Sequence, residues 1–95
     1  MLYFLVRYKI IKSGLFDAAF YLKSNPDVRK SDVDPLWHFI NCGWKEGRDP
    51  SKDFSIKKYF SNHPEIKSNG TNPLLHYISI SKKMRNNKGT DSSET

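Results

Sequence analysis

The sequence predicts an all-α fold: a lead helix, two tandem helix–loop–helix repeats of about 38 residues, and a disordered C-terminal tail. The chain matches itself at one constant offset of 38 residues, without a gap. The matched segments place apolar residues three and four apart, as an amphipathic helix does, and no stretch alternates apolar and polar residues long enough to indicate a strand. Repeats of about 20–50 residues are typical of small units that bury their apolar faces against one another.

The repeat divides the chain into four parts. The lead helix is expected over residues 2–12 and ends at Ser13-Gly14, where serine and glycine break the apolar pattern. The second repeat is more polar than the first, as expected for a terminal repeat that faces water. The resulting boundaries are 1–14 for the lead helix, 15–53 for repeat 1, 54–85 for the degenerate, capping repeat 2, and 86–95 for the disordered tail.

The first helix of each repeat has a clear start and stop. Asp17 in the first copy and Ser55 in the second are good N-caps, since their side-chain oxygens accept a free backbone amide of the following turn. The helix is expected to end before Pro26 or Pro64, because a residue that precedes proline disfavours the helical conformation. The proline then begins a second, short helical segment.

The second helix of repeat 1 begins at Asp34-Pro35, an Asx cap followed by proline at the first helical position. This helix is expected over Pro35–Cys42, with Gly43 as a left-handed C-cap. The equivalent helix of repeat 2 is expected over Pro73–Lys83; it lacks that glycine, so it is expected to run on.

Six positions kept by both copies, twelve residues in all, are expected to be structural. They are the aromatic, proline, leucine and histidine positions with which each unit buries one face against the other. The two histidines are expected to donate a ring hydrogen to a loop carbonyl. The positions are Phe16, Tyr21, Pro26, Leu36, His38 and Phe39 in repeat 1, and Phe54, Tyr59, Pro64, Leu74, His76 and Tyr77 in repeat 2.

The composition is that of one small globular domain. The 95 residues are 37% hydrophobic, 27% charged and 14% aromatic, and large rings let a thin core bury more area per residue. The length excludes an enzyme with a separate cofactor domain. The single cysteine, Cys42, excludes an intramolecular disulfide and a multi-cysteine zinc site.

No catalytic site, metal site or cofactor is expected. His38 and Cys42 have a four-residue spacing that places two ligands side by side, but zinc needs three or four, and repeat 2 has Ile80 at the cysteine position. Asp32-x-Asp34 lacks the glycine and the distal glutamate of a calcium loop. The sequence also contains neither a phosphate-binding loop nor a nucleophile elbow.

Three segments of repeat 1 carry the most specific pattern: Phe16-Asp17-x-x-x-Tyr21-Leu22-x-x-Asn25-Pro26-Asp27-Val28, Asp34-Pro35-Leu36-x-His38-Phe39, and Gly43-Trp44-x-Glu46-Gly47-Arg48-Asp49-Pro50. This pattern resembles a tandem module found beside bacterial glycosyltransferases that build cell-surface polysaccharide, including rhamnan-synthesis-type proteins. Similar repeats occur in some RTX-type proteins. The resemblance covers residues 8–83, and repeat 2 departs from it at Ser55, Glu65 and Ser81.

The resemblance implies a non-catalytic helical interaction module that accompanies a protein partner or a linked glycosyltransferase domain. The chain is then either a stand-alone protein or the truncated N-terminal region of such an enzyme. Two alternatives stay open. One is a segment of a glycosyltransferase that is active only with its catalytic domain; the other is a small basic domain that binds carbohydrate or nucleic acid.

Six residues are candidates for binding. Trp37 and Trp44 are candidates for carbohydrate because aromatic faces stack on sugar rings, although buried rings are more common and Trp44 is also expected over the seam between the repeats. Replacement of Trp44 by alanine is expected to leave the fold intact. The cationic candidates would meet nucleic acid, acidic lipid or an acidic protein. The six are Trp37, Trp44, Arg48, Lys82, Lys83 and Arg85.

The net charge of +6 is unevenly distributed. Residues 1–53 have nine basic and seven acidic side chains, whereas residues 54–95 have seven basic and three acidic ones. The sequence contains neither a bilayer-spanning apolar run nor a recognisable secretory signal. A cytoplasmic location is therefore expected, with the inner membrane surface as an alternative place of contact.

Overall fold

The computed structural model describes residues 2–82, and this part of the chain is all-α, which confirms the predicted fold class. Residues 1 and 83–95 lie outside the described part. The expected helix end at Lys83, the end of repeat 2 at residue 85 and the expected tail at 86–95 therefore also lie outside it. Within residues 2–82 the only β pairing is an isolated bridge between Ser51 and Phe54.

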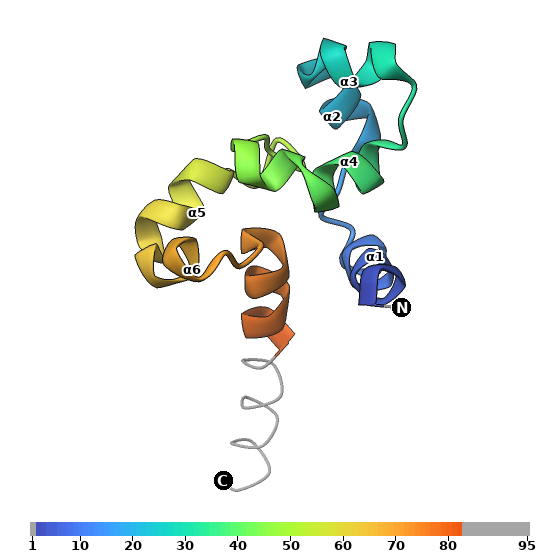
Figure 1. The fold of residues 1–95 in the computed structure, drawn as a ribbon. Helices are drawn as coiled ribbons and strands as arrows, with labels where there is room; N and C mark the ends of the chain where they lie inside the picture. The colour runs from blue at the N-terminus through green and yellow to red at the C-terminus, as the bar shows by residue number, and fades with distance from the viewer. Residues whose placement is uncertain (1, 83–95) are drawn as a thin grey trace, which may run out of the picture.

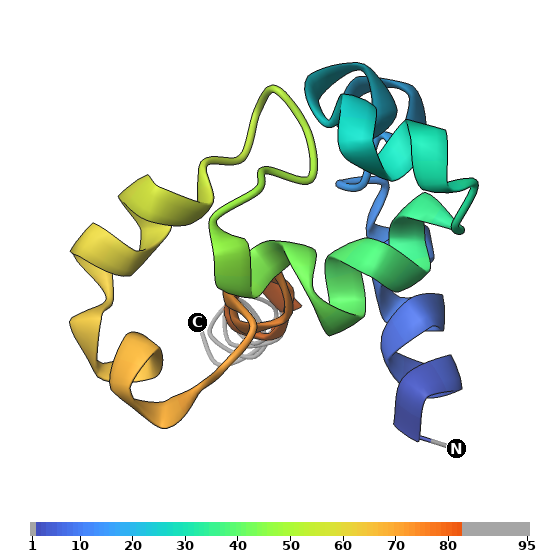
Figure 2. The ribbon, with the colours of Figure 1, turned by 45° about the horizontal axis from the view of Figure 1, so that its top comes forward.

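The helices form two groups along the chain, with α1 beside the first (Figure 1). In Figure 2 the loop that follows η1 crosses from the first group to the second. The elements are α1 (Leu2–Ser13), α2 (Ala18–Ser24), α3 (Pro26–Ser31), α4 (Pro35–Asn41), the 3₁₀ turn η1 (Gly43–Glu46), α5 (Ile56–Asn62), α6 (Pro64–Asn69) and a last helix described over residues 73–82, called here the 73–82 helix.

The helices start where the capping residues predict. The Asp17 carboxylate accepts the backbone N–H three residues on at 3.0 Å, and the Asp34 carboxylate accepts the one two residues on at 3.2 Å. In repeat 2, Ser55 and Asn72 cap their helices in the same way, at 3.2 and 2.9 Å. Each cap satisfies an amide that has no partner within its own helix.

The end of α4 differs from the expectation. The helix ends at Asn41, and its C-cap is Cys42. Gly43 is not a left-handed C-cap: the next glycine along the chain, Gly47, is left-handed, with φ 78°, and ends η1. The chain passes directly from α4 into the 3₁₀ turn, so the backbone reverses only after that turn.

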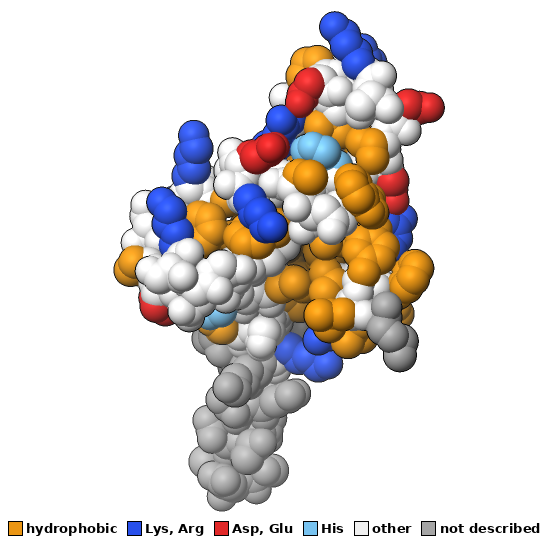
Figure 3. Space-filling view, in the orientation of Figure 1, with side chains coloured by type: hydrophobic (Ala, Val, Ile, Leu, Met, Phe, Trp, Pro, Cys, Tyr) orange, Lys and Arg blue, Asp and Glu red, His pale blue; other side chains and the backbone are white. Residues whose placement is uncertain are grey.

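One apolar core joins α1 and both repeats. Trp44 connects the two halves, because its ring lies 6.5 Å from the ring of Phe60, measured between centroids. Figure 3 shows hydrophobic side chains gathered over the α1 side of the molecule. The buried core consists of Ile10, Tyr21, Val28, Leu36, Phe39, Trp44, Phe54, Ile56 and Leu74.

The loop between the repeats also fastens them together. The backbone N–H of Asp17 donates to the carbonyl of Pro50 at 2.9 Å, which closes repeat 1. The Asp49 carboxylate accepts the backbone N–H of Ile56 at 2.8 Å, which holds the start of α5 against the beginning of that loop.

Candidate functional site

Each repeat has a tyrosine–histidine pair near its centre. The Tyr21 hydroxyl lies 2.7 Å from Nδ1 of His38, and the Tyr59 hydroxyl lies 2.7 Å from Nδ1 of His76. With its hydrogen on Nε2, each histidine accepts this bond from the hydroxyl. The partner of Nδ1 is therefore a tyrosine side chain and not the loop carbonyl that the sequence suggested.

The aromatic rings around the two pairs correspond closely. The Phe16 ring lies 5.6 Å from that of Phe39, and the Phe54 ring lies 5.5 Å from that of Tyr77. The first phenylalanine of each repeat lies 5.3 Å from its tyrosine in both cases. One difference is exposure: Phe39 is fully buried, whereas Tyr77 is 40% exposed.

The other positions shared by the repeats serve the helices and the core. Leu36 and Leu74 are both buried. Pro26 and Pro64 are exposed and occupy the first residue of α3 and α6, where the fixed φ of proline suits a helix start.

Gly43 makes the burial of Tyr21 possible. A Cβ at this position would overlap the Tyr21 hydroxyl oxygen and would lie 3.1 Å from its Cζ. The phenol ring thus packs directly on the glycine backbone, and burial raises the pKa of the Tyr21 hydroxyl well above its ordinary value. The need for glycine here is steric and does not come from a left-handed backbone.

Arg48, a candidate for binding, forms an ion cluster within repeat 1. Its guanidinium donates two hydrogen bonds to the Asp27 carboxylate, both of 2.9 Å, and a third to the Asn25 side-chain oxygen, also of 2.9 Å. Its Nε donates to Glu46 at 2.8 Å. The hydrogen bonds from Arg48 lower the pKa of Asp27 to about 2, and the same bonds raise the pKa of Arg48. The cluster ties the end of η1 to the start of α3.

The two tryptophans lie in different environments. Trp44 is 8% exposed, and its Nε1 donates to the carbonyl of Ile40 at 3.0 Å, so its ring is part of the seam between the repeats. Trp37 is 43% exposed on α4. Only Trp37 of the two therefore presents an accessible ring.

Residues 2–82 present neither a metal-binding cluster nor a membrane-spanning helix. In that range no three His, Cys, Asp or Glu side chains gather closely enough to hold a metal ion, and Cys42 is a half-buried free thiol. The described helices include none with the length and hydrophobicity needed to cross a bilayer. Lys83 and Arg85, two further binding candidates, lie outside the described residues.

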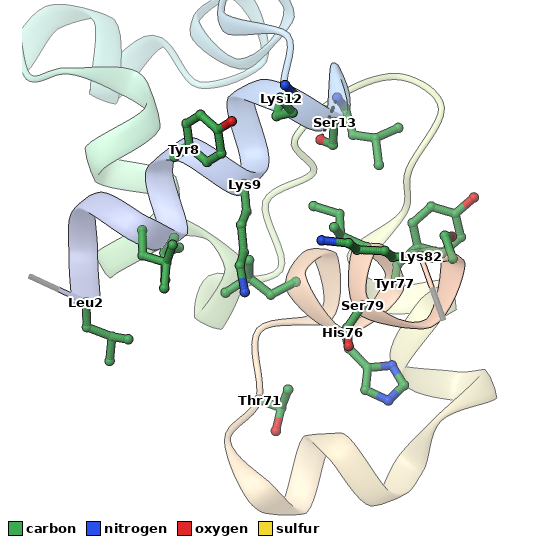
Figure 4. A pocket seen from close by; sticks show the side chains of 16 residues that line it. Leu2, Tyr8, Lys9, Lys12, Ser13, Thr71, His76, Tyr77, Ser79 and Lys82 are labelled. Atoms are coloured by element: carbon green, nitrogen blue, oxygen red, sulfur yellow. Dashed lines mark hydrogen bonds between the residues drawn. The ribbon is translucent and has the colours of Figure 1, made fainter. Parts of the chain in front are cut away.

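An open groove of about 1230 Å³ lies between α1 and the 73–82 helix (Figure 4). Half-buried apolar side chains that pack on the core line its inner part. In Figure 4, Lys9 extends from α1 and Lys82 from the opposite helix toward the space between them. The inner apolar residues are Val6, Leu15, Leu75 and Ile78; Leu2, Leu5, Tyr8, Lys9, Lys12 and Lys82 line the rim.

Sequence reasoning identified Lys82 but missed the α1 wall of this groove. Apolar residues lie on nearly all sides of α1, whereas a helix that covers a core has one apolar and one polar face. Its inner side packs on the core through Ile10, which is fully buried, and its outer side leaves Leu2 and Leu5 in solvent. The surplus of apolar residues in the segment 2–11 was the signal that could have indicated a second contact surface.

No protein-family model, curated protein sequence or solved structure matches the chain. The likeness to the glycosyltransferase-associated module therefore stays a prediction from the repeat motif.

Proposed function

We propose that the chain is a non-catalytic helical interaction module and that the groove between α1 and the 73–82 helix is its binding surface. The exposure of apolar side chains along α1 carries this proposal: Leu2 is 74% exposed and Leu5 is 50% exposed. Both line a concave surface rimmed by lysines. A contiguous apolar surface with a polar rim is typical of an interaction site.

The use of the polar side chains within the fold supports a non-catalytic role. His38 and His76 are hydrogen bonded to buried or half-buried tyrosines, and Arg48 is bonded to three neighbouring side chains. These two histidines and this arginine, residue types that often carry acid–base or anion chemistry, are thus engaged in packing the repeats.

We propose further that the partner is a glycosyltransferase of surface polysaccharide synthesis, as a separate protein or as a domain linked to this chain. The motif of repeat 1 supports this part of the proposal. A cytoplasmic location, with contact at the inner membrane surface, follows from such a partner.

The test is affinity capture from a lysate of the source cells with three forms of the chain. Leu5→Glu places a charge in the groove, and Phe4→Glu, on the same helix, is the matched control because Phe4 is 69% exposed and does not line the groove. We expect a glycosyltransferase to be enriched by the wild type and by Phe4→Glu, and to be lost with Leu5→Glu. Capture of the same proteins by all three forms would contradict the proposal that the groove is the binding surface. If the proteins lost with Leu5→Glu included no glycosyltransferase, the proposed partner would be wrong.

A further inference from the structure

The groove between α1 and the 73–82 helix has the size and form of a site for a polypeptide segment. Its volume of about 1230 Å³ exceeds the range of about 300–1000 Å³ typical of small-molecule pockets. Its two long walls are helices, and α1 has 12 residues, which at about 1.5 Å per residue gives a wall of roughly 18 Å. A helix of about three turns laid along α1 would contact the full length of this wall.

The inner lining combines apolar side chains with half-buried polar ones such as Ser13, Thr71 and His76, and the rim is basic. Val6 and Leu15 on one side and Leu75 on the other pack on the core and present their remaining surface to the groove. Lys9, Lys12 and Lys82 are the only charged residues among the described residues that line it. An occupant that matches this surface has an apolar stripe flanked by carboxylates.

No acidic residue is among the described side chains that line the groove. Residues 1–16 contain three basic residues and no acid, and residues 66–82 contain two basic residues and no acid. Arg7, the remaining basic residue of α1, forms an ion pair with Asp34, the N-cap of α4, at 2.7 Å. Its charge is therefore compensated within the fold. Basic charges on apolar walls raise the local concentration of an anionic partner.

Two other occupants fit these observations less well. An anionic membrane surface would contact outward-facing residues such as Phe4, but a flat surface does not enter a concave groove whose apolar depth is formed by half-buried side chains. In a second copy, α1 carries the same basic charges as the groove and would be repelled by it.

We infer that the groove takes an acidic amphipathic helix of a protein partner, with its apolar stripe on Leu5 and Leu75 and its carboxylates beside Lys9, Lys12 and Lys82. This inference rests on the proposed function, because it names the partner segment that the interaction module would recognise. Helix-in-groove recognition of this kind reads side chains spaced i, i+3, i+4 and i+7 on the bound helix.

The test selects 16-residue peptides from a random display library on the full chain and then measures their affinities by fluorescence anisotropy. We expect the selected peptides to carry leucine or phenylalanine at helical spacing together with aspartate or glutamate. Leu5→Glu should abolish binding, and Lys9→Glu combined with Lys12→Glu should weaken it at least about tenfold, because two attractive charge pairs become repulsive. Phe4→Glu should bind like the wild type.

Several outcomes would overturn the inference, and they separate it from the proposed function. Selected peptides that are neutral or basic yet lose binding with Leu5→Glu would leave the groove as an interaction site and refute the acidic helix. Peptides that bind all variants equally, or the failure to select any, would refute both. Binding of the chain to vesicles of phosphatidylglycerol and phosphatidylcholine tests the membrane alternative. If both Phe4→Glu and Leu5→Glu abolished this binding, the surface would be assigned to lipid. Dimerisation abolished by Leu5→Glu would assign it to a second copy.

Discussion

Gly43→Ala tests the packing at the centre of repeat 1. The added methyl group would overlap the hydroxyl oxygen of Tyr21, whose side chain is fully buried and cannot move into solvent. Forcing an extra methyl group into a filled core costs about 1–3 kcal/mol. Displacement of the hydroxyl would also break its 2.7 Å hydrogen bond to His38, and a polar group left without a partner in such a site costs about 1–3 kcal/mol. We expect a loss of about 3 kcal/mol in the free energy of unfolding, out of roughly 5–15 kcal/mol for a domain of this size.

A double-mutant cycle with Tyr21→Phe isolates the cause. Without the hydroxyl the overlap disappears, and the nearest remaining atom, at the former Cζ position, lies 3.1 Å from the added Cβ. In the Tyr21→Phe background, Gly43→Ala should therefore cost only about 1 kcal/mol, which gives a coupling of about 2 kcal/mol. Urea unfolding of the four proteins measures all the terms.

Repeat 2 supplies the matched control. Its equivalent position is Ser81, and its tyrosine, Tyr59, is half-buried where Tyr21 is fully buried. Ser81→Gly should change stability by less than about 1 kcal/mol, the helix-propensity cost of glycine. If Gly43→Ala were to cost the same with Tyr21 and with phenylalanine in its place, the hydroxyl would not be the group that excludes a side chain from position 43.

Three further predictions concern the core, the seam and the ion cluster. Phe39→Ala should destabilise the chain by about 3–5 kcal/mol, whereas Trp37→Ala, at an exposed position of the same helix, should change stability by less than about 1 kcal/mol; thermal melts of both variants compare them. Trp44→Ala should also cost about 3–5 kcal/mol, contrary to the expectation from sequence, because the ring is buried at the seam; an unchanged melting temperature would place the seam elsewhere. Because Arg48 lowers the pKa of Asp27 to about 2 in the fold, this carboxylate stabilises the fold above its unfolded pKa of about 3.8, and the effect is lost as the pH falls toward 2. Asp27→Asn should therefore be less stable than the wild type at pH 6, and this difference should shrink as the pH falls toward 2 in urea unfolding; a constant difference across that range would exclude the ion pair as the cause.

Features that depend on a few neighbouring residues were predictable from sequence. The N-caps Asp17 and Asp34 form hydrogen bonds two or three residues along the chain, so their residue types alone indicate where the helices begin. The proline that starts α3 restricts its own φ and the conformation of the residue before it. This effect also extends over only two residues.

Features that depend on distant partners were not predictable in the same way. Gly43 has the sequence context of a C-cap, but its role is set by the Tyr21 ring, which another helix places against it. His38 finds its hydrogen-bond partner 17 residues away, and Arg48 finds Asp27 at a separation of 21 residues. A sequence shows that such residues need partners without showing which side chain will be within reach.

The sequence by itself determined the all-α class, the lead helix and the starts of the repeat helices, because capping, proline geometry and apolar spacing act over a few residues. Only the tertiary structure decided which apolar side chains remain uncovered. Leu5 and Ile10 are equally apolar in the sequence, yet one is half exposed and the other is fully buried, since burial depends on where the neighbouring helices lie. The groove itself exists because α1 and the 73–82 helix, at opposite ends of the described chain, both pack on the same core and leave a space between them.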